Sequence, residues 1–220
     1  MRTAAAVLIA AGILAWGGSA AAQVIGDPVP SINKGNLDVG VSLESFSRDL
    51  SYEGGGSDSV DYSRAGFRVD YGWAKNRAIQ FFISETEIDP GPGGAWRGPE
   101  VGIGYRQPID ITIPIAGRGA PTALFGDFRY GNTEDGSTFK YFQYQFGYGG
   151  SFPFSRTLDI YAAALYSDVY GRIEGNDVRA VDNIGFMGGV DFLASSNIRL
   201  TAELHIFHEF GIGLMIQFML

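Results

Sequence analysis

The chain has 220 residues, 24 Asp and Glu against 16 Lys and Arg, a formal net charge of −8, and no cysteine. This length is typical of one domain, and the acidity excludes nucleic acid as an expected partner, because nucleic-acid binding requires basic patches. Without cysteine, neither disulfides nor a lipid attached to an N-terminal cysteine can contribute to the structure.

Residues 1–22 have the pattern of a secretory signal peptide. Arg2 provides a positive start, Ala4–Trp16 an apolar stretch, and Ala20–Ala22 a small-residue cleavage site. The alternative, a helix that anchors the mature protein, would need a longer apolar stretch. We therefore predict export and cleavage near Ala22, which would leave 198 residues with 15 basic and 24 acidic side chains.

Residues 35–220 contain ten segments in which apolar and polar side chains alternate. Because successive side chains of a strand point to opposite faces, each segment predicts a strand with one apolar face. The predicted strands are Leu37–Ser47, Val60–Trp73, Ala78–Glu87, Glu100–Gln107, Thr122–Gly131, Phe139–Gly150, Leu158–Ser167, Ile184–Leu193, Ile198–Phe207 and Gly211–Phe218. Ahead of them, Pro28 and Pro30 predict that residues 23–34 form a short extended tail on the periplasmic side.

The links between these segments are rich in Gly, Pro, Asn, Asp and Ser, as turns require. Long and short links broadly alternate, which is typical of bacterial barrels with long loops at one rim. The long links are expected at 57–59, 89–94, 132–136 and 174–177, and the short ones at 74–77, 152–157 and 194–197. Two links depart from this alternation, because Pro108–Pro121 is longer and His208–Phe210 is shorter than its place predicts.

If the mature chain lies in a membrane, only a closed barrel can satisfy the backbone hydrogen bonds of such strands. We therefore predict an all-β fold, a closed antiparallel up-and-down transmembrane β-barrel over residues 35–220. Ten strands are expected, with eight as the alternative. An even number of strands places both ends of the barrel on the same side of the membrane.

The charged side chains predict which face of the barrel is inside. In the second segment, Arg64, Arg68 and Asp70 share one face, and Phe67 and Val69 share the other. A basic residue that faces lipid at the middle of a bilayer costs about 2–4 kcal/mol, so the charged face should line the lumen. The expected luminal residues are Glu44, Arg64, Arg68, Asp70, Glu100, Arg106, Asp127, Arg129, Asp191, Arg199, Glu203 and His205.

A soluble barrel of the lipocalin type would turn the same faces the other way, with the charges in water. The aromatic side chains argue against it, because most of them lie toward strand ends on the face opposite the charges. Rings at such places form the interfacial girdles of membrane barrels. They are Tyr71, Trp73, Tyr105, Phe128, Tyr130, Tyr148, Tyr166, Phe192 and Phe218.

The expected luminal charges include both signs in similar numbers. A selective pore tends to line its constriction with one sign of charge, whereas opposite charges pair, and side chains can fill the interior of a small barrel. We therefore predict a charge-paired, largely plugged lumen. A narrow pore for ions or small solutes is the alternative.

Catalysis is not expected. His205 and His208 lie close to Glu203 and Glu209, and a histidine beside a carboxylate can act as a general base. The pattern of outer-membrane lipid A deacylases, however, places a serine two residues after the histidine, where this chain has Phe210. The acidic loops lack the spacing of calcium-binding loops, and no cysteine–histidine cluster suggests zinc, so we expect neither a cofactor nor a metal site.

Two stretches near the end of the chain carry a family resemblance. Gly185–Phe207 combines a glycine-rich strand, a short Ser-Asn turn and an amphipathic return strand, and the ending contains Gly213, Ile216 and Phe218, followed by Met219 and Leu220. These features resemble the small Gram-negative outer-membrane barrels of the opacity and OmpA-like type and their terminal assembly signal. The resemblance implies a monomer that the barrel-assembly machinery inserts among outer-membrane lipid and lipopolysaccharide. It also implies a role in envelope integrity, surface interaction or slow solute passage.

Overall fold

The computed structural model describes residues 24–89, 95–115, 117–135, 137–173, 176–207 and 209–220, so the predicted signal peptide lies outside the described residues. The described chain forms eleven strands and no helix long and apolar enough to cross a membrane. The strands are β1 (Leu37–Tyr52), β2 (Ser57–Ala74), β3 (Arg77–Asp89), β4 (Trp96–Ile115), β5 (Arg118–Asp135), β6 (Ser137–Pro153), β7 (Leu158–Ile173), β8 (Asn176–Ala180), β9 (Ile184–Ser195), β10 (Ile198–Ile206) and β11 (Phe210–Met219).

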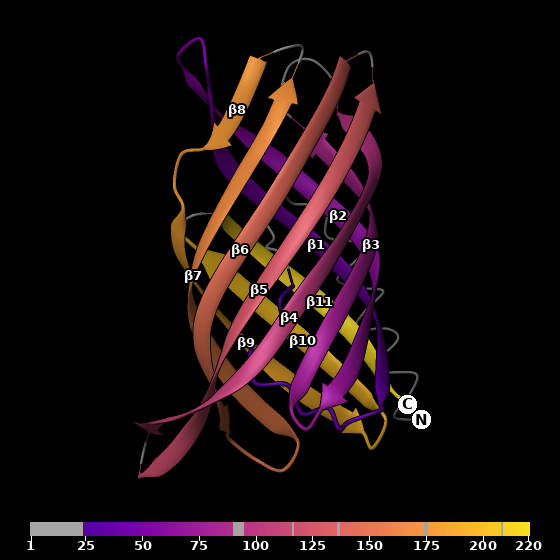
Figure 1. Cartoon of the computed structure of the whole chain (residues 1–220), viewed down its shortest axis with the longest axis vertical. Coiled ribbons are helices and arrows are strands. Elements are labelled where there is room, and N and C mark those ends of the chain that lie inside the picture. The colour runs from indigo at the N-terminus through magenta and orange to yellow at the C-terminus, as the bar shows by residue number, and fades with distance from the viewer. Residues whose placement is uncertain (1–23, 90–94, 116, 136, 174–175, 208) are drawn as a thin grey trace.

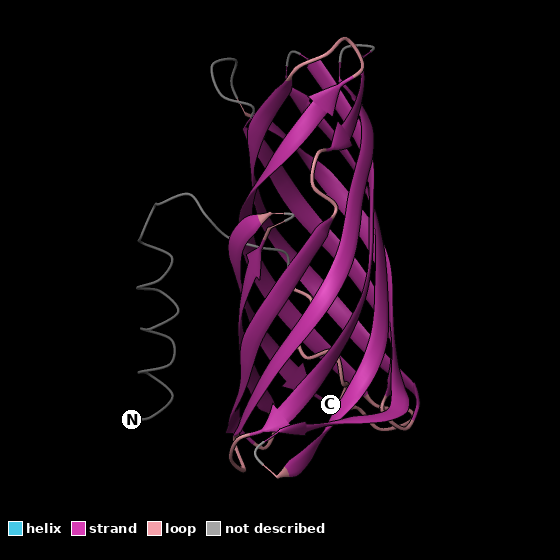
Figure 2. Ribbon diagram, turned by 90° about the vertical axis from the view of Figure 1, so that its left-hand side faces the viewer, coloured by secondary structure: helices cyan, strands magenta, loops and turns pink. Residues whose placement is uncertain are grey.

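Ten of these strands close into an antiparallel barrel (Figures 1 and 2). Each of β1–β6 pairs with the next strand. β7 then pairs with β9, and β9 pairs with β10 and β10 with β11. The ring closes where β11 runs antiparallel to β1, from Met219 opposite Asp38 to Phe210 opposite Ser47. The predicted closed barrel and its ten strands are confirmed. We call the rim that carries Leu220 the C-terminal rim and the opposite one the far rim.

The eleventh strand, β8, was not predicted. It pairs with β7 on one side and with β1 on the other, beyond the ends of the shorter strands β9–β11. Beyond the ends of β9–β11, β8 alone fills the gap in the wall between β7 and β1 (Figure 1). A loop was expected at residues 174–177, of which 174–175 lie outside the described residues. Residues 176–177 instead begin β8, where Val178 and Ala180 turn inward and are buried.

Three other predicted links are paired strand where the structure describes them. Residues 132–135 continue β5 and pair with β6, whereas residues 136 and 90–94 lie outside the described residues. Residues 57–59 continue β2 opposite Ser51 and Asp49 of β1. The long link Pro108–Pro121 is the end of a β4–β5 hairpin that projects from the C-terminal rim (Figure 1). Its pairing resumes after a bulge between Ile109 and Thr112, and Gly117 adopts a φ of +77° at the tip, a conformation that favours glycine. Isoleucines at alternate positions from 109 to 115 are typical of a strand, whereas the prolines of this link led to the prediction of a loop.

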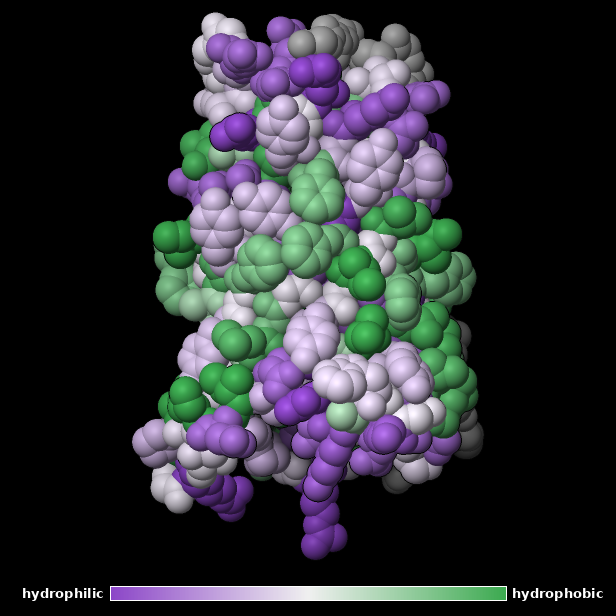
Figure 3. Space-filling model, in the orientation of Figure 1, coloured by the Kyte–Doolittle hydropathy of each residue, from purple (hydrophilic) through white to green (hydrophobic). Residues whose placement is uncertain are grey.

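The outward side chains form an apolar belt around the barrel. On β1, outward Ser45 and Asp49 lie toward the far rim, whereas outward Val41 lies toward the C-terminal rim. On β3, outward Phe81 and Ile83 are likewise followed by polar side chains. Figure 3 shows apolar side chains gathered across the middle of the visible face, with polar ones predominating at the far rim. We call this band the outer belt.

Residues 24–32, which we call the luminal segment, lie inside the barrel. Val24 and Ile25 are 1% and 0% exposed, and the backbone of Ile25 bonds to wall side chains of β2, β4 and β10. Residues 23–34 were expected to form a short extended tail on the periplasmic side; of these, the luminal segment lies within the lumen, and residue 23 lies outside the described residues. Arg68, Arg106 and Glu203 bond to this backbone in addition to their partners in the wall.

Candidate functional site: the barrel lumen

The interior of the barrel holds all twelve side chains that the sequence places in the lumen. Eleven of them belong to buried residues, and the side chain of Arg199 is 17% exposed. The structure brings most of these residues together in three groups, and an apolar cap closes the lumen toward the far rim.

An apolar cap fills the lumen near the far rim. Phe46 and Tyr62 stack with ring centroids 4.6 Å apart, and Tyr62 meets Tyr141 edge to face. None of these residues was predicted to point inward, although Phe46 has the strand parity of Glu44 and Tyr62 that of Arg64. The cap consists of Phe46, Leu50, Val60, Tyr62, Ile88, Trp96, Phe139, Tyr141, Val169, Ile173, Val178 and Ala180.

A charge cluster around Glu100 lies directly below the apolar cap. Glu100 pairs with Arg64 at 2.7 Å and with Arg129 at 3.1 Å, and it accepts a hydrogen bond from the Tyr141 hydroxyl at 2.7 Å. Glu44 lies 3.5 Å from both guanidinium groups. Two carboxylates and two guanidinium groups from four strands thus neutralise one another across the lumen, in agreement with the predicted charge pairing.

A second cluster joins β10 to β1 and includes two residues, Arg48 and Glu209, that were not among the predicted luminal residues. His205 lies between Glu203 and Glu209, at 2.7 and 2.9 Å, and Glu209 also pairs with Arg48 at 3.4 Å. All four side chains are fully buried. The inward position of Arg48 was predictable, because it has the same strand parity as Glu44. Glu209 lies after β10 and outside any strand, so parity could not predict its position. His208 lies outside the described residues.

A third cluster lies closest to the C-terminal rim. Arg68 bonds to both carboxylate oxygens of Asp70 at 2.7 Å, and Gln80 and Gln217 also donate to Asp70. Arg199 lies 3.8 Å from Asp191, which accepts a hydrogen bond from Thr201. The remaining predicted residues make other contacts. Asp127 accepts from Gln145, and Arg106 donates to Gln80 and to the backbone of the luminal segment.

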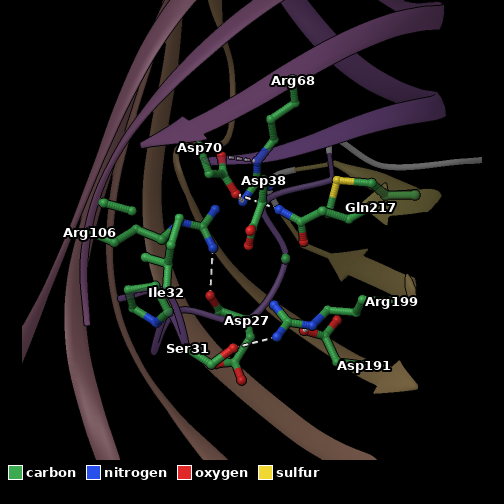
Figure 4. A pocket seen from close by; sticks show the side chains of 14 residues that line it. Asp27, Ser31, Ile32, Asp38, Arg68, Asp70, Arg106, Asp191, Arg199 and Gln217 are labelled. Carbon is green, nitrogen blue, oxygen red and sulfur yellow. Dashed lines mark hydrogen bonds and ion pairs between the residues drawn. The ribbon is translucent and has the colours of Figure 1, made fainter. Parts of the chain in front are cut away.

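The luminal segment lies on this third cluster, as Figure 4 shows. The N–H groups of Ile25 and Gly26 donate to the two oxygens of Glu203 at 2.7 and 2.8 Å. The carbonyl of Ile25 accepts from Arg68 at 2.7 Å and from Arg106. The carbonyl of Asp27 accepts from Arg106, and its carboxylate from Ser151. The segment thus occupies space that would otherwise leave charged groups facing an open lumen.

Three aromatic side chains fill the space beside inward glycines. Tyr141 lies opposite Gly131, Phe125 opposite Gly147, and Tyr161 opposite Gly189 in the strand pairing. A Cβ built on any of these glycines would come within 2.1–2.4 Å of the paired ring. Each ring therefore lies over its glycine partner, and the lumen is packed by side chains as the interior of a small barrel allows.

The predicted assembly residues lie on β11, which joins both of its neighbours. Gly213 points inward, opposite Glu44 on one side and Glu203 on the other. Ile216 and Phe218 point outward into the outer belt, and Phe218 is 45% exposed. Their role in assembly stays a prediction. Among the described residues, no group of three or more His, Cys, Asp or Glu is placed to hold a metal ion.

The fold and its interior define a closed ten-stranded antiparallel β-barrel with a filled lumen. Comparison of the sequence with protein-family models and with curated proteins finds no match.

Proposed function

We propose that this protein is an integral barrel of the bacterial outer membrane with a closed lumen, and that it serves envelope structure or surface interaction. The observation that carries the proposal is the filled interior: an apolar cap, the Glu100 cluster and the luminal segment follow one another along the axis. A wall with apolar groups outside and paired charges inside is suited to lipid, not to water.

The outer belt supports residence in a membrane. Large apolar side chains such as Phe67, Phe81 and Ile83 are 61%, 51% and 57% exposed. A continuous apolar surface of this kind is rare on soluble monomers. Trp73 and Tyr105 stack near the C-terminal rim with ring centroids 6.3 Å apart. Aromatic rings at this level would lie among the lipid headgroups. In this arrangement the C-terminal rim faces the periplasm, and outer-membrane lipid and lipopolysaccharide surround the belt.

The belt predicts a strong position dependence for introduced charge. Phe81→Arg, at the middle of the belt on β3, should lower the free energy of unfolding in phospholipid vesicles by about 2–4 kcal/mol, because a cation must face hydrocarbon. Glu85→Arg on the same outward face lies beyond Ile83 and should change it by less than about 1 kcal/mol. Urea titration of the refolded variants measures both. Equal effects at the two positions would contradict the membrane assignment.

The lumen supports a structural role over a pore. Opposite charges pair at 2.7–3.5 Å in the Glu100 cluster, so the described residues present no ring of one sign there to select an ion. The His205 cluster is fully buried between β10 and β1, so a substrate has no access to it in this structure. A buried ionic cluster of this kind supports the wall.

The deciding experiment is single-channel recording of the refolded chain from Gln23 in planar bilayers. We expect no steady conductance, because the Glu100 cluster and the apolar cap both close the lumen independently of the luminal segment. A stable conductance in the unmodified protein would overturn the proposal in favour of a narrow pore. Turnover of lipid A in isolated outer membranes would instead favour an enzyme.

A further inference from the structure

At Ile25 and Gly26, the wall of the lumen holds the luminal segment by its main chain. The two oxygens of Glu203 accept from the successive N–H groups of Ile25 and Gly26. Arg68 and Arg106 both donate to the carbonyl of Ile25. These contacts involve no side chain of the segment, so they would serve any extended chain of the right shape.

Glu203 is held in place before it meets the segment. The Tyr161 hydroxyl donates to it at 2.7 Å, and His205 lies 2.7 Å from its other oxygen. Arg68 is likewise fixed by its two bonds to Asp70. Buried hydrogen bonds with a charged partner are the stronger kind. A fixed carboxylate that accepts from backbone N–H groups and a fixed guanidinium group that donates to a backbone carbonyl together form a peptide-binding site.

Two features of the site determine which peptide sequences it can bind. The Ile25 side chain packs in an apolar group with Phe125, Tyr161, Ala163, Leu165 and Met187. Gly26 has a φ of +75°, and a Cβ there would lie 3.4 Å from Arg68 and 3.5 Å from Met215. A β-branched residue strongly disfavours such a φ. The site therefore fits an apolar residue followed by glycine.

We propose that the lumen contains a peptide-binding site for an extended chain with an apolar residue followed by glycine, and that the luminal segment is its intramolecular ligand. The site is built by Arg68, Arg106 and Glu203 with the apolar group around Ile25. A peptide of the same sequence replaces the segment when the segment is absent. The inference deepens the proposed function and rests on its closed lumen for the shielding of the site from solvent.

The absence of cysteine from the chain allows a direct test with a single introduced thiol. Met215 is 3% exposed and lines the pocket beside the luminal segment. Met215→Cys is placed in the chain from Gln23 and in a chain that begins at Ser31, both refolded, and the rate of modification by a charged methanethiosulfonate is measured. We expect at least about tenfold faster modification in the shorter chain, since about 1.4 kcal/mol of lost protection produces that factor. A peptide with the sequence of residues 24–30 should restore protection.

Matched controls separate binding from general loosening. Thr86→Cys, buried on β3 away from the pocket, should stay protected in both chains. The peptide carrying Gly26→Val should protect at least about tenfold less well, since it leaves the protein unchanged but cannot adopt the required φ. In the chain from Gln23, Gly26→Val should expose the reporter at Met215, whereas Gly35→Val should not. Gly35 also has a positive φ, but no atom lies within 4 Å of its Cβ position.

Two outcomes would overturn the inference. If Met215→Cys is equally protected without the luminal segment, the segment fills no site. If the reporter is exposed and neither peptide protects it, or both protect it equally, the wall does not recognise the chain as described. Should the shorter chain fail to refold, the Gly26→Val and Gly35→Val variants decide alone. Conductance in the unmodified protein would overturn the proposed closed lumen and would leave the peptide measurements valid, so the two failures are distinguishable.

Discussion

Replacement of Glu100 by alanine is expected to lower the free energy of unfolding by about 3–5 kcal/mol, because it leaves buried guanidinium groups without their main partner. Glu100 is 1% exposed and accepts contacts from Arg64, Arg129 and the Tyr141 hydroxyl. The remaining carboxylate, Glu44, lies 3.5 Å from both arginines and cannot replace the lost bonds without movement. Urea unfolding of the refolded variant, followed by tryptophan fluorescence, measures the loss.

The matched control is Glu87→Ala, on the outer face of the barrel. Glu87 pairs with Arg97 at 2.8 Å, a distance similar to that between Glu100 and Arg64, but the two side chains are 39% and 67% exposed. Exposed pairs contribute at most about 1 kcal/mol. If both variants lose equally little stability, water reaches the Glu100 cluster, and the narrow pore becomes the better account of the lumen.

Deletion of Phe218–Leu220 is expected to prevent accumulation of the barrel in the outer membrane. The ring closes through β11, and this deletion removes the pairs of Met219 with Asp38 and of Phe218 with Val39, together with the bond from the Leu220 N–H to Leu37. Unpaired backbone groups are not tolerated in hydrocarbon. Immunoblots of fractionated outer membranes from a Gram-negative host would show the loss, together with proteolytic fragments in the periplasm.

A single substitution separates closure of the ring from recognition of the terminal signal. Phe218→Ala keeps every backbone pair but removes the near-terminal ring, and it should still lower outer-membrane levels if the assembly machinery reads this residue. Phe192→Ala on β9 is the control, because both rings point outward with nearly the same exposure, 44% for Phe192 and 45% for Phe218. Equal levels of the two variants would mean that Phe218 acts as one belt residue among many.

The interior changes character along the barrel axis, and the outer face changes with it. Near the far rim, outward Ser45 and Asp49 suit water, and the inside holds the apolar cap, as in a soluble protein. At the level of the outer belt, apolar side chains face outward and charges face inward. The inversion follows from the surroundings proposed for each level, since each apolar face must avoid water and each charge must avoid lipid.

Sequence alone was sufficient for the ten strands that close the ring, although not for β8. The period of two assigns each side chain to one face, and this property depends only on the local chain. The ten alternating segments therefore predicted the ten strands of the ring, and the parity of Arg64 and Arg68 predicted that they point inward. The same parity was available for Arg48 and Phe46, which the sequence analysis did not assign.

Only the tertiary structure decided which side chains contact one another inside the barrel. Glu100 pairs with Arg64 and Arg129 because β2, β4 and β5 bring them to the same level of the lumen, and that level depends on how the strands are staggered around the closed ring. β8 gains a partner on each side only because β9–β11 end early. The luminal segment has no alternation to reveal its place. Its backbone binds wherever Glu203, Arg68 and Arg106 converge, and only closure of the barrel brings those three side chains together.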